Sequence, residues 1–176
     1  MSFGSLAPNA GGGQAGAVSE QAASTVTAVP PADPVTAHAH FAGRLAVETD
    51  ADDVAAAIAA GRRDFVLVDA RSPAAYAAAH LPGAISLPHA LIGEDTLADL
   101  PAGLLVVYCW SPGCNAATKA AARLTALGRQ VKEMLGGFEY WVREGHPLEG
   151  DANGSERYAP DRSGLVGLAP EADCGC

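Results

Sequence analysis

The chain has 176 residues, of which 49% are hydrophobic, and a formal net charge of −9. This length suits one domain with residues to spare and allows a core without disulfide bonds. The excess of 20 acidic over 11 basic residues argues against nucleic acid or an anionic membrane as the main partner. No apolar run approaches the roughly 18 residues of a membrane span, and the first ten residues lack the basic and apolar regions of a secretory signal. We therefore expect a soluble, cytoplasmic protein.

Composition divides the chain into three parts. Residues 1–37 are rich in Gly, Ala, Ser, Pro and Thr and contain no Lys or Arg, which predicts a disordered N-terminal tail. Residues 38–150 have the periodic pattern of a globular domain. Residues 151–176 contain turn-forming residues throughout and predict a loosely structured C-terminal tail that ends in Cys174-Gly175-Cys176.

Strand and helix patterns alternate within the globular part. The predicted strands are 65–68, 104–108 and, more weakly, 130–134, and the predicted helices are 50–60, 73–79, 116–127 and 138–144. The first two strand segments are continuously apolar, as in strands that are covered on both faces of a parallel sheet. Ser72-Pro73 is a helix-start signal and Gly128 a helix-stop signal. The pattern predicts one α/β domain with a central, mainly parallel sheet flanked by helices on both faces.

The most informative junction follows the strand 104–108. Cys109 comes directly after it, and a short loop leads into the helix 116–127. Ligands of parallel sheets bind at the carboxyl ends of strands, and a helix N-terminus offers free N–H groups to an anion. We therefore expect a lowered pKa for the Cys109 thiol and a nucleophile that works near neutral pH. The candidate substrate-binding residues are those of the loop, namely Trp110, Ser111, Gly113, Cys114 and Asn115.

Several segments together carry a family resemblance. They are Asp69-Ala70-Arg71, Tyr76, His80-Leu81-Pro82-Gly83-Ala84, Val107-Tyr108-Cys109, and Leu135-Gly136-Gly137 with Trp141. On these motifs, residues 60 to 148 resemble a single rhodanese-like domain, the sulfurtransferase fold. The chain departs from the family pattern in three features. The loop after Cys109 is longer and contains a second cysteine, and the first basic residue after it, Lys119, lies one turn into the helix. The chain also ends in Cys-Gly-Cys.

The resemblance implies a sulfurtransferase that forms a persulfide on Cys109. The Cys109 thiolate would attack the outer sulfur of a sulfane donor such as thiosulfate, and sulfite would leave. Backbone N–H groups of residues 110–115 would hold the terminal sulfur, and a thiol or cyanide would accept it. This chemistry requires no metal and no cofactor. The sequence indicates neither the physiological donor and acceptor nor the oligomeric state.

The second cysteine of the loop leaves an alternative open. Cys114 could resolve the persulfide by forming a disulfide with Cys109, could carry the persulfide itself, or could simply fill the loop. The first possibility describes a thiol redox or sulfur-binding module in which Cys109 and Cys114 alternate between dithiol and disulfide. Cys174 and Cys176 could receive sulfur from Cys109 or have no role. A zinc site is disfavoured because neither cysteine pair has the usual C-x₂-C spacing.

The remaining prominent residues have mainly structural interpretations. Asp69 is expected to cap a backbone segment or to pair with Arg71, Arg71 to support the scaffold, and His80 to be a packing histidine. One of Tyr140 and Trp141 is expected to pack into the core. An oxyanion-binding phosphatase or arsenate reductase would need Arg six positions after Cys109, where this chain has Asn115, so that activity is disfavoured.

Overall fold

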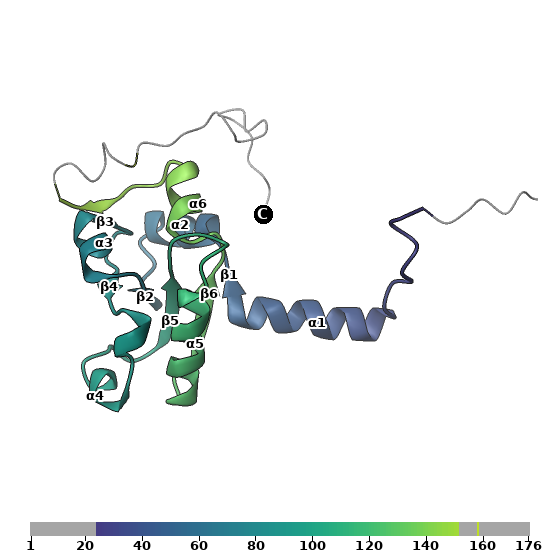
Figure 1. The fold of residues 1–176 in the computed structure, drawn as a ribbon, viewed down its shortest axis with the longest axis horizontal. Coiled ribbons are helices and arrows are strands. Elements are labelled where there is room, and N and C mark those ends of the chain that lie inside the picture. The colour runs from purple at the N-terminus through teal and green to yellow at the C-terminus, as the bar shows by residue number, and fades with distance from the viewer. Residues whose placement is uncertain (1–23, 152–157, 159–176) are drawn as a thin grey trace, which may run out of the picture. The chain divides into compact units, whose positions relative to one another are not determined.

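A computed structural model describes residues 24–151 and Tyr158 (Figure 1). The predictions for residues 1–23 and for most of the C-terminal tail, including Cys174 and Cys176, lie outside the described residues. In residues 24–37, a turn at Ser24–Thr27 precedes helix α1, Pro34–Val47. The Asp33 carboxylate accepts hydrogen bonds from the backbone N–H groups of Val35 and Thr36. Because of this cap, residues 34–37 are helical where the sequence predicted part of a tail.

The central sheet has five strands in the order β1-β6-β5-β2-β4, and every neighbouring pair is parallel. The strands are β1 Glu48–Thr49, β2 Phe65–Asp69, β4 Ile85–Ser86, β5 Leu104–Tyr108 and β6 Val131–Met134. A separate antiparallel pair joins β3, Ala79–His80, to β7, Glu149–Gly150. The α/β fold with a mainly parallel sheet is therefore confirmed.

The helices agree with the sequence prediction to within one residue at each end wherever one was predicted. These helices are α2 Ala51–Ala59, α3 Pro73–Ala78, α5 Ala116–Ala126 and α6 Gly137–Arg143. The short elements that the sequence did not indicate are β1, β3, β4 and β7, the 3₁₀ helix η1 at His89–Leu91, and α4 at Glu94–Leu97. Each of them contains only two to four residues, which is too short for a hydrophobic period to become visible.

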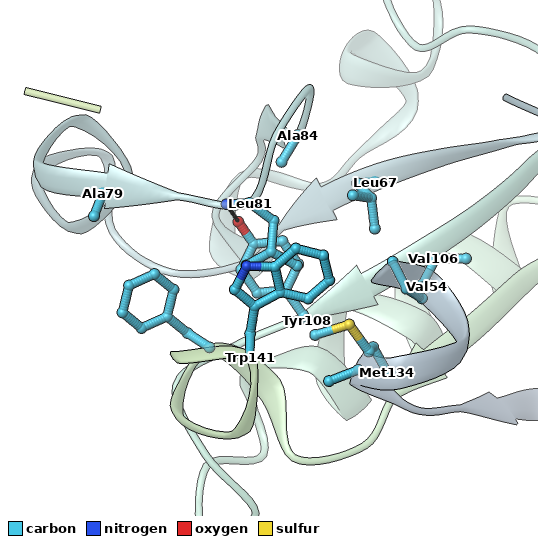
Figure 2. Packing of buried hydrophobic residues seen from close by; sticks show 11 residues of the cluster. Val54, Leu67, Ala79, Leu81, Ala84, Val106, Tyr108, Met134 and Trp141 are labelled. Atoms are coloured by element: carbon cyan, nitrogen blue, oxygen red, sulfur yellow. Dashed lines mark hydrogen bonds between the residues drawn. The ribbon is translucent and has the colours of Figure 1, made fainter. Parts of the chain in front are cut away.

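Helices cover both faces of the sheet, as predicted. On one face, Leu67, Val106 and Tyr108 belong to a cluster with side chains of α2 and α6. Figure 2 shows the ring of Trp141 in the middle of this cluster, next to Leu81 and Tyr108. On the other face, alternate residues of the same strands pack against α5; this second cluster includes Val68, Leu105, Val107, Ala117, Ala120 and Leu124. Of the helices in the described segments, none has the length and apolarity needed to cross a bilayer.

A buried ion pair lies at the carboxyl end of β2. Arg71 Nη2 lies 2.6 Å from Asp69 Oδ2, and both side chains are fully buried. Arg71 also donates to the carbonyl of Ala79 at 2.6 Å, and the Tyr108 hydroxyl donates to Asp69 Oδ2 at 2.8 Å. The same hydroxyl accepts from the backbone N–H of Leu81 at 3.2 Å. Burial, followed by the charge of Asp69, raises the pKa of Tyr108, so this hydroxyl stays a donor. The network joins β2, β3 and β5.

Asp69→Asn tests how much this network contributes to stability. The substitution leaves the buried Arg71 charge uncompensated, which costs about 3–5 kcal/mol of unfolding free energy. Asp64→Asn is the matched control, because Asp64 pairs with Arg62 at 3.2 Å with both side chains largely exposed. Its cost is below about 1 kcal/mol. Urea unfolding measures both values, and equal losses in the two variants would contradict a special role of the buried pair.

Candidate active site

A cavity of about 490 Å³ opens at the carboxyl edge of the sheet. It is lined by residues that follow three neighbouring parallel strands: Asp50 after β1, Leu135 and Gly136 after β6, and Cys109 after β5. The N-terminal residues of α5 complete the wall. Because parallel strands deliver their carboxyl ends to the same edge, segments far apart in the chain meet here.

The loop between β5 and α5 presents two free thiols to the cavity. Cys109 is only 3% exposed, and its thiol donates to the carbonyl of Cys114 at 3.0 Å. The backbone N–H of Cys114 donates to the carbonyl of Ser111 at 2.9 Å, which closes a tight turn. Of the residues predicted from the sequence, Cys109, Ser111, Gly113, Cys114 and Asn115 line the cavity.

Trp110 differs from its neighbours, because its ring packs beside the cavity wall. The ring lies edge-on to Phe138, with 5.7 Å between the ring centroids, and the guanidinium carbon of Arg71 is 4.5 Å from the Trp110 ring centroid. The same carbon is 4.0 Å from the centroid of Phe138. These cation–π contacts stabilise the charge of Arg71, whose Nη1 atom has no hydrogen-bond partner among the described residues. The structure therefore connects Trp110 to the buried ion pair.

Helix α6 holds the Cys109 backbone in place. Its first free N–H groups, those of Phe138 and Glu139, donate to the carbonyls of Cys109 and Trp110, each at 2.8 Å. Gly137 makes this close approach possible, because its φ is +61° and a Cβ atom there would lie 2.6 Å from the carbonyl oxygen of Cys109. The Gly136-Gly137 pair, interpreted from the sequence as a turn, thus positions the candidate nucleophile.

The two thiols have pKa values that shift in opposite directions. Burial raises the pKa of Cys109, and its hydrogen bond to Cys114 adds to the increase, although backbone groups of Ala117 and Ser111 oppose it. Burial alone would raise the pKa of Cys114, but backbone groups of Ala116 and Trp110, the Cys109 thiol and the charge of Lys119 together lower it. The expected lowering at Cys109 is therefore wrong, because the loss of water around its sulfur outweighs the helix N-terminus. Cys114 loses its proton first.

Three acidic residues of the cavity were not predicted as site residues. They are Asp50, Glu133 and Glu144. One signal was available for Glu133, since it lies next to the carboxyl end of the predicted strand 130–134. Among the described residues, no group of three His, Cys, Asp or Glu side chains is arranged to hold a metal ion.

Comparison with known proteins supports the resemblance to a rhodanese-like domain. The sequence profile described as "Rhodanese-like domain" matches residues 50–144. The chain is 43% identical over 86 residues to the thiosulfate sulfurtransferase GlpE of Pseudomonas entomophila, which covers 48% of this chain and 75% of that protein. It is 36% identical over 87 residues to an HTH-type transcriptional regulator of Mycobacterium tuberculosis, and this match covers 49% of the chain but only 38% of the regulator.

A solved structure agrees with the sequence matches. The BH2092 protein of Bacillus halodurans superposes with a TM-score of 0.65 at 43% sequence identity, and the match covers 67% of this chain and 87% of that one.

Gly137→Ala tests the support of Cys109 by α6. The new methyl group would displace the Cys109 carbonyl, and we expect slower alkylation of Cys109 by iodoacetamide. Gly61→Ala is the control, because Gly61 has a similar φ of +72° with open space around it. Both variants lose about 1–2 kcal/mol of unfolding free energy through backbone strain. Only Gly137→Ala is expected to slow the alkylation of Cys109. Equal alkylation rates in the two variants, measured by peptide mass spectrometry, would contradict this role of Gly137.

The coupling of the two thiols predicts opposite responses to alanine substitution. In Cys114→Ala, Cys109 loses the partner that raises its pKa, so its alkylation begins at a lower pH than in the wild type. In Cys109→Ala, Cys114 loses a hydrogen-bond donor that lowers its pKa, so its alkylation begins at a higher pH. Site-resolved alkylation against pH measures both shifts, and shifts in the same direction would exclude the coupling.

Proposed function

Because the chain belongs to the rhodanese-like domain family, we propose that it is a sulfurtransferase that carries sulfane sulfur on Cys109. The observation that carries this proposal is the position of Cys109 at the end of β5, with its sulfur in a cavity beside the N-terminus of α5. In this position the nearly buried side chain of Cys109 borders the cavity, while hydrogen bonds from α6 fix its backbone.

The first half-reaction begins with deprotonation of Cys109. The thiol proton passes to solvent, which leaves Cys109 as the thiolate nucleophile. The Cys109 thiolate attacks the outer sulfur of thiosulfate and forms a new S–S bond. The original S–S bond breaks, and its electron pair leaves with sulfite, so that a Cys109 persulfide remains.

The persulfide anion is stabilised by the same backbone groups that favour the thiolate. Amides of Ser111 and Ala117 oppose the rise in the pKa of Cys109, which indicates that they interact with its sulfur. They belong to the loop and the first turn of α5, where N–H groups have no partner within the helix. A thiol or cyanide then removes the outer sulfur and restores the Cys109 thiolate.

A second candidate function follows from the presence of both thiols in one cavity. The Cys114 thiolate attacks the inner sulfur of the Cys109 persulfide, forms a Cys109–Cys114 disulfide and expels hydrosulfide. Two equivalents of an external thiol would reduce the disulfide. The hydrogen bond from Cys109 to the Cys114 carbonyl, 3.0 Å, favours this reaction because it keeps the two residues together. We place both reactions in the cytoplasm, where thiol reductants keep cysteines reduced.

Intact-protein mass spectrometry after incubation with thiosulfate tests the proposal. The wild type is expected to gain one sulfur, about 32 Da for one step of sulfur addition to cysteine. Cys109→Ser abolishes the gain and Cys114→Ser retains it. Loading that survives Cys109→Ser but not Cys114→Ser would assign the carrier to Cys114. If no variant gains sulfur and the wild type only loses two hydrogens, the redox function replaces sulfur transfer.

A further inference from the structure

The charges of the cavity walls favour some sulfur acceptors of Cys109 over others. This inference rests on the proposed function, because it concerns the second half-reaction. The walls contain the carboxylates of Asp50, Glu133 and Glu144, and among the described residues no Lys or Arg lines the cavity. The cavity thus has an acidic wall, consisting of these three residues, around a thiol that exchanges sulfur.

The acidic wall has few compensating charges. Asp50 accepts a hydrogen bond from the backbone N–H of Asp53 at 2.9 Å, and Glu133 accepts from the Thr118 hydroxyl at 3.0 Å. Both donors are neutral. Within the described ranges, Glu144 alone of the three has an ionisable partner, His146, whose Nε2 lies 3.2 Å from the carboxylate. The carboxylates therefore keep most of their negative potential.

The pKa of Glu144 is raised mainly by burial. The charges of Asp52 and Asp50 raise it further, although His146 acts in the opposite direction. The nearby cation Lys119 influences the thiol of Cys114. It lies on α5, whereas Glu144 directly follows α6.

The cavity consequently has two regions with different chemistry. Backbone amides of the loop and of α5 face the sulfur atoms and favour a sulfur anion. The acidic wall borders the same cavity, where the group attached to that sulfur would lie. A carboxylate next to the sulfur would be repelled there, and so would the sulfonate of thiosulfate, which therefore loads Cys109 only at high concentration. An ammonium or guanidinium would be attracted.

We propose that the sulfur acceptor is a thiol with a cationic group close to its sulfur, and that the acidic wall selects it. The acceptor thiol passes its proton to the Cys109 persulfide anion, and the resulting thiolate attacks the outer sulfur and forms a new S–S bond. The bond between the two sulfurs at Cys109 breaks, and Cys109 leaves as a thiolate with the electron pair. The product is the persulfide of the cationic thiol. Its source is either a small aminothiol or a protein cysteine flanked by Lys or Arg.

Three thiols of equal chain length test the proposal. Protein loaded by saturating thiosulfate and freed of excess reagent is mixed with cysteamine, 2-mercaptoethanol or 3-mercaptopropionate, which are cationic, neutral and anionic. Mass spectrometry follows the loss of the added sulfur, and rates are expressed per thiolate. Cysteamine is expected to react roughly tenfold faster than 3-mercaptopropionate, as for charges a few ångströms apart near a protein surface. Equal rates, or faster reaction of the anion, would overturn the proposal.

Charge-neutralising variants control for the intrinsic reactivity of each thiol, because that reactivity is the same with every variant and cancels when the rate ratios are compared. Glu144→Gln and Glu133→Gln each lower the cysteamine-to-mercaptopropionate ratio about threefold. Glu94→Gln, an exposed change on α4 outside the cavity, leaves the ratio unchanged. A ratio that both cavity variants leave intact would exclude the acidic wall as its cause. If the wild type never loads sulfur, which the first spectrum shows before any thiol is added, the proposed function fails and this inference with it.

Two peptides distinguish the sources of the acceptor. A pentapeptide with Cys between two Lys residues is compared with one that has Cys between two Glu residues. A preference for the Lys peptide that exceeds the preference for cysteamine supports a protein acceptor. A preference confined to cysteamine supports a small aminothiol. No charge preference in either pair would contradict the proposal.

Discussion

The buried ion pair between Asp69 and Arg71 is the interaction on which the organisation of the active edge depends. It bonds to the Tyr108 hydroxyl at the end of β5 and to the Ala79 carbonyl in β3. Its guanidinium also lies against the ring of Trp110, the residue after the candidate nucleophile. A charge without access to water tolerates little displacement, because each lost hydrogen bond leaves a desolvated group. The pair therefore determines where β5 ends and where the loop begins.

Different residues of the site fix the position of the Cys109 backbone and influence the pKa values of the two thiols. Backbone hydrogen bonds from α6 hold the Cys109 carbonyl, and the close contact at Gly137 leaves no room for a side chain. The pKa values of the two thiols depend instead on burial first, and then on the contact between the two cysteines and on nearby backbone groups. The three carboxylates of the acidic wall take part in neither the hydrogen bonds to the Cys109 carbonyl nor the close contact at Gly137. They can therefore be substituted without a change in these backbone contacts.

The sequence was sufficient to predict the elements with a hydrophobic period. Val107 and its neighbours form a continuous apolar run, and Ser72-Pro73 and Gly128 mark helix ends that the structure confirms. Cys109 was identifiable because it follows a buried strand directly. Asp50 and Glu144 were not, since only the strand order brings them to the cavity. The direction of the pKa shift at Cys109 was predicted wrongly because burial is a tertiary property. The roles of Ser111, Gly113 and Asn115 stay predictions.

The strand order also has a consequence for biosynthesis. The cavity combines residues that follow β1, β5 and β6, so its wall is complete only after Glu144 has left the ribosome. Until then, both loop thiols on the nascent chain lack the surroundings that make them differ. Contacts of such long sequence separation form late in folding. An unfinished chain would thus have two ordinary cysteines, and their distinct acidities would arise together with the finished domain.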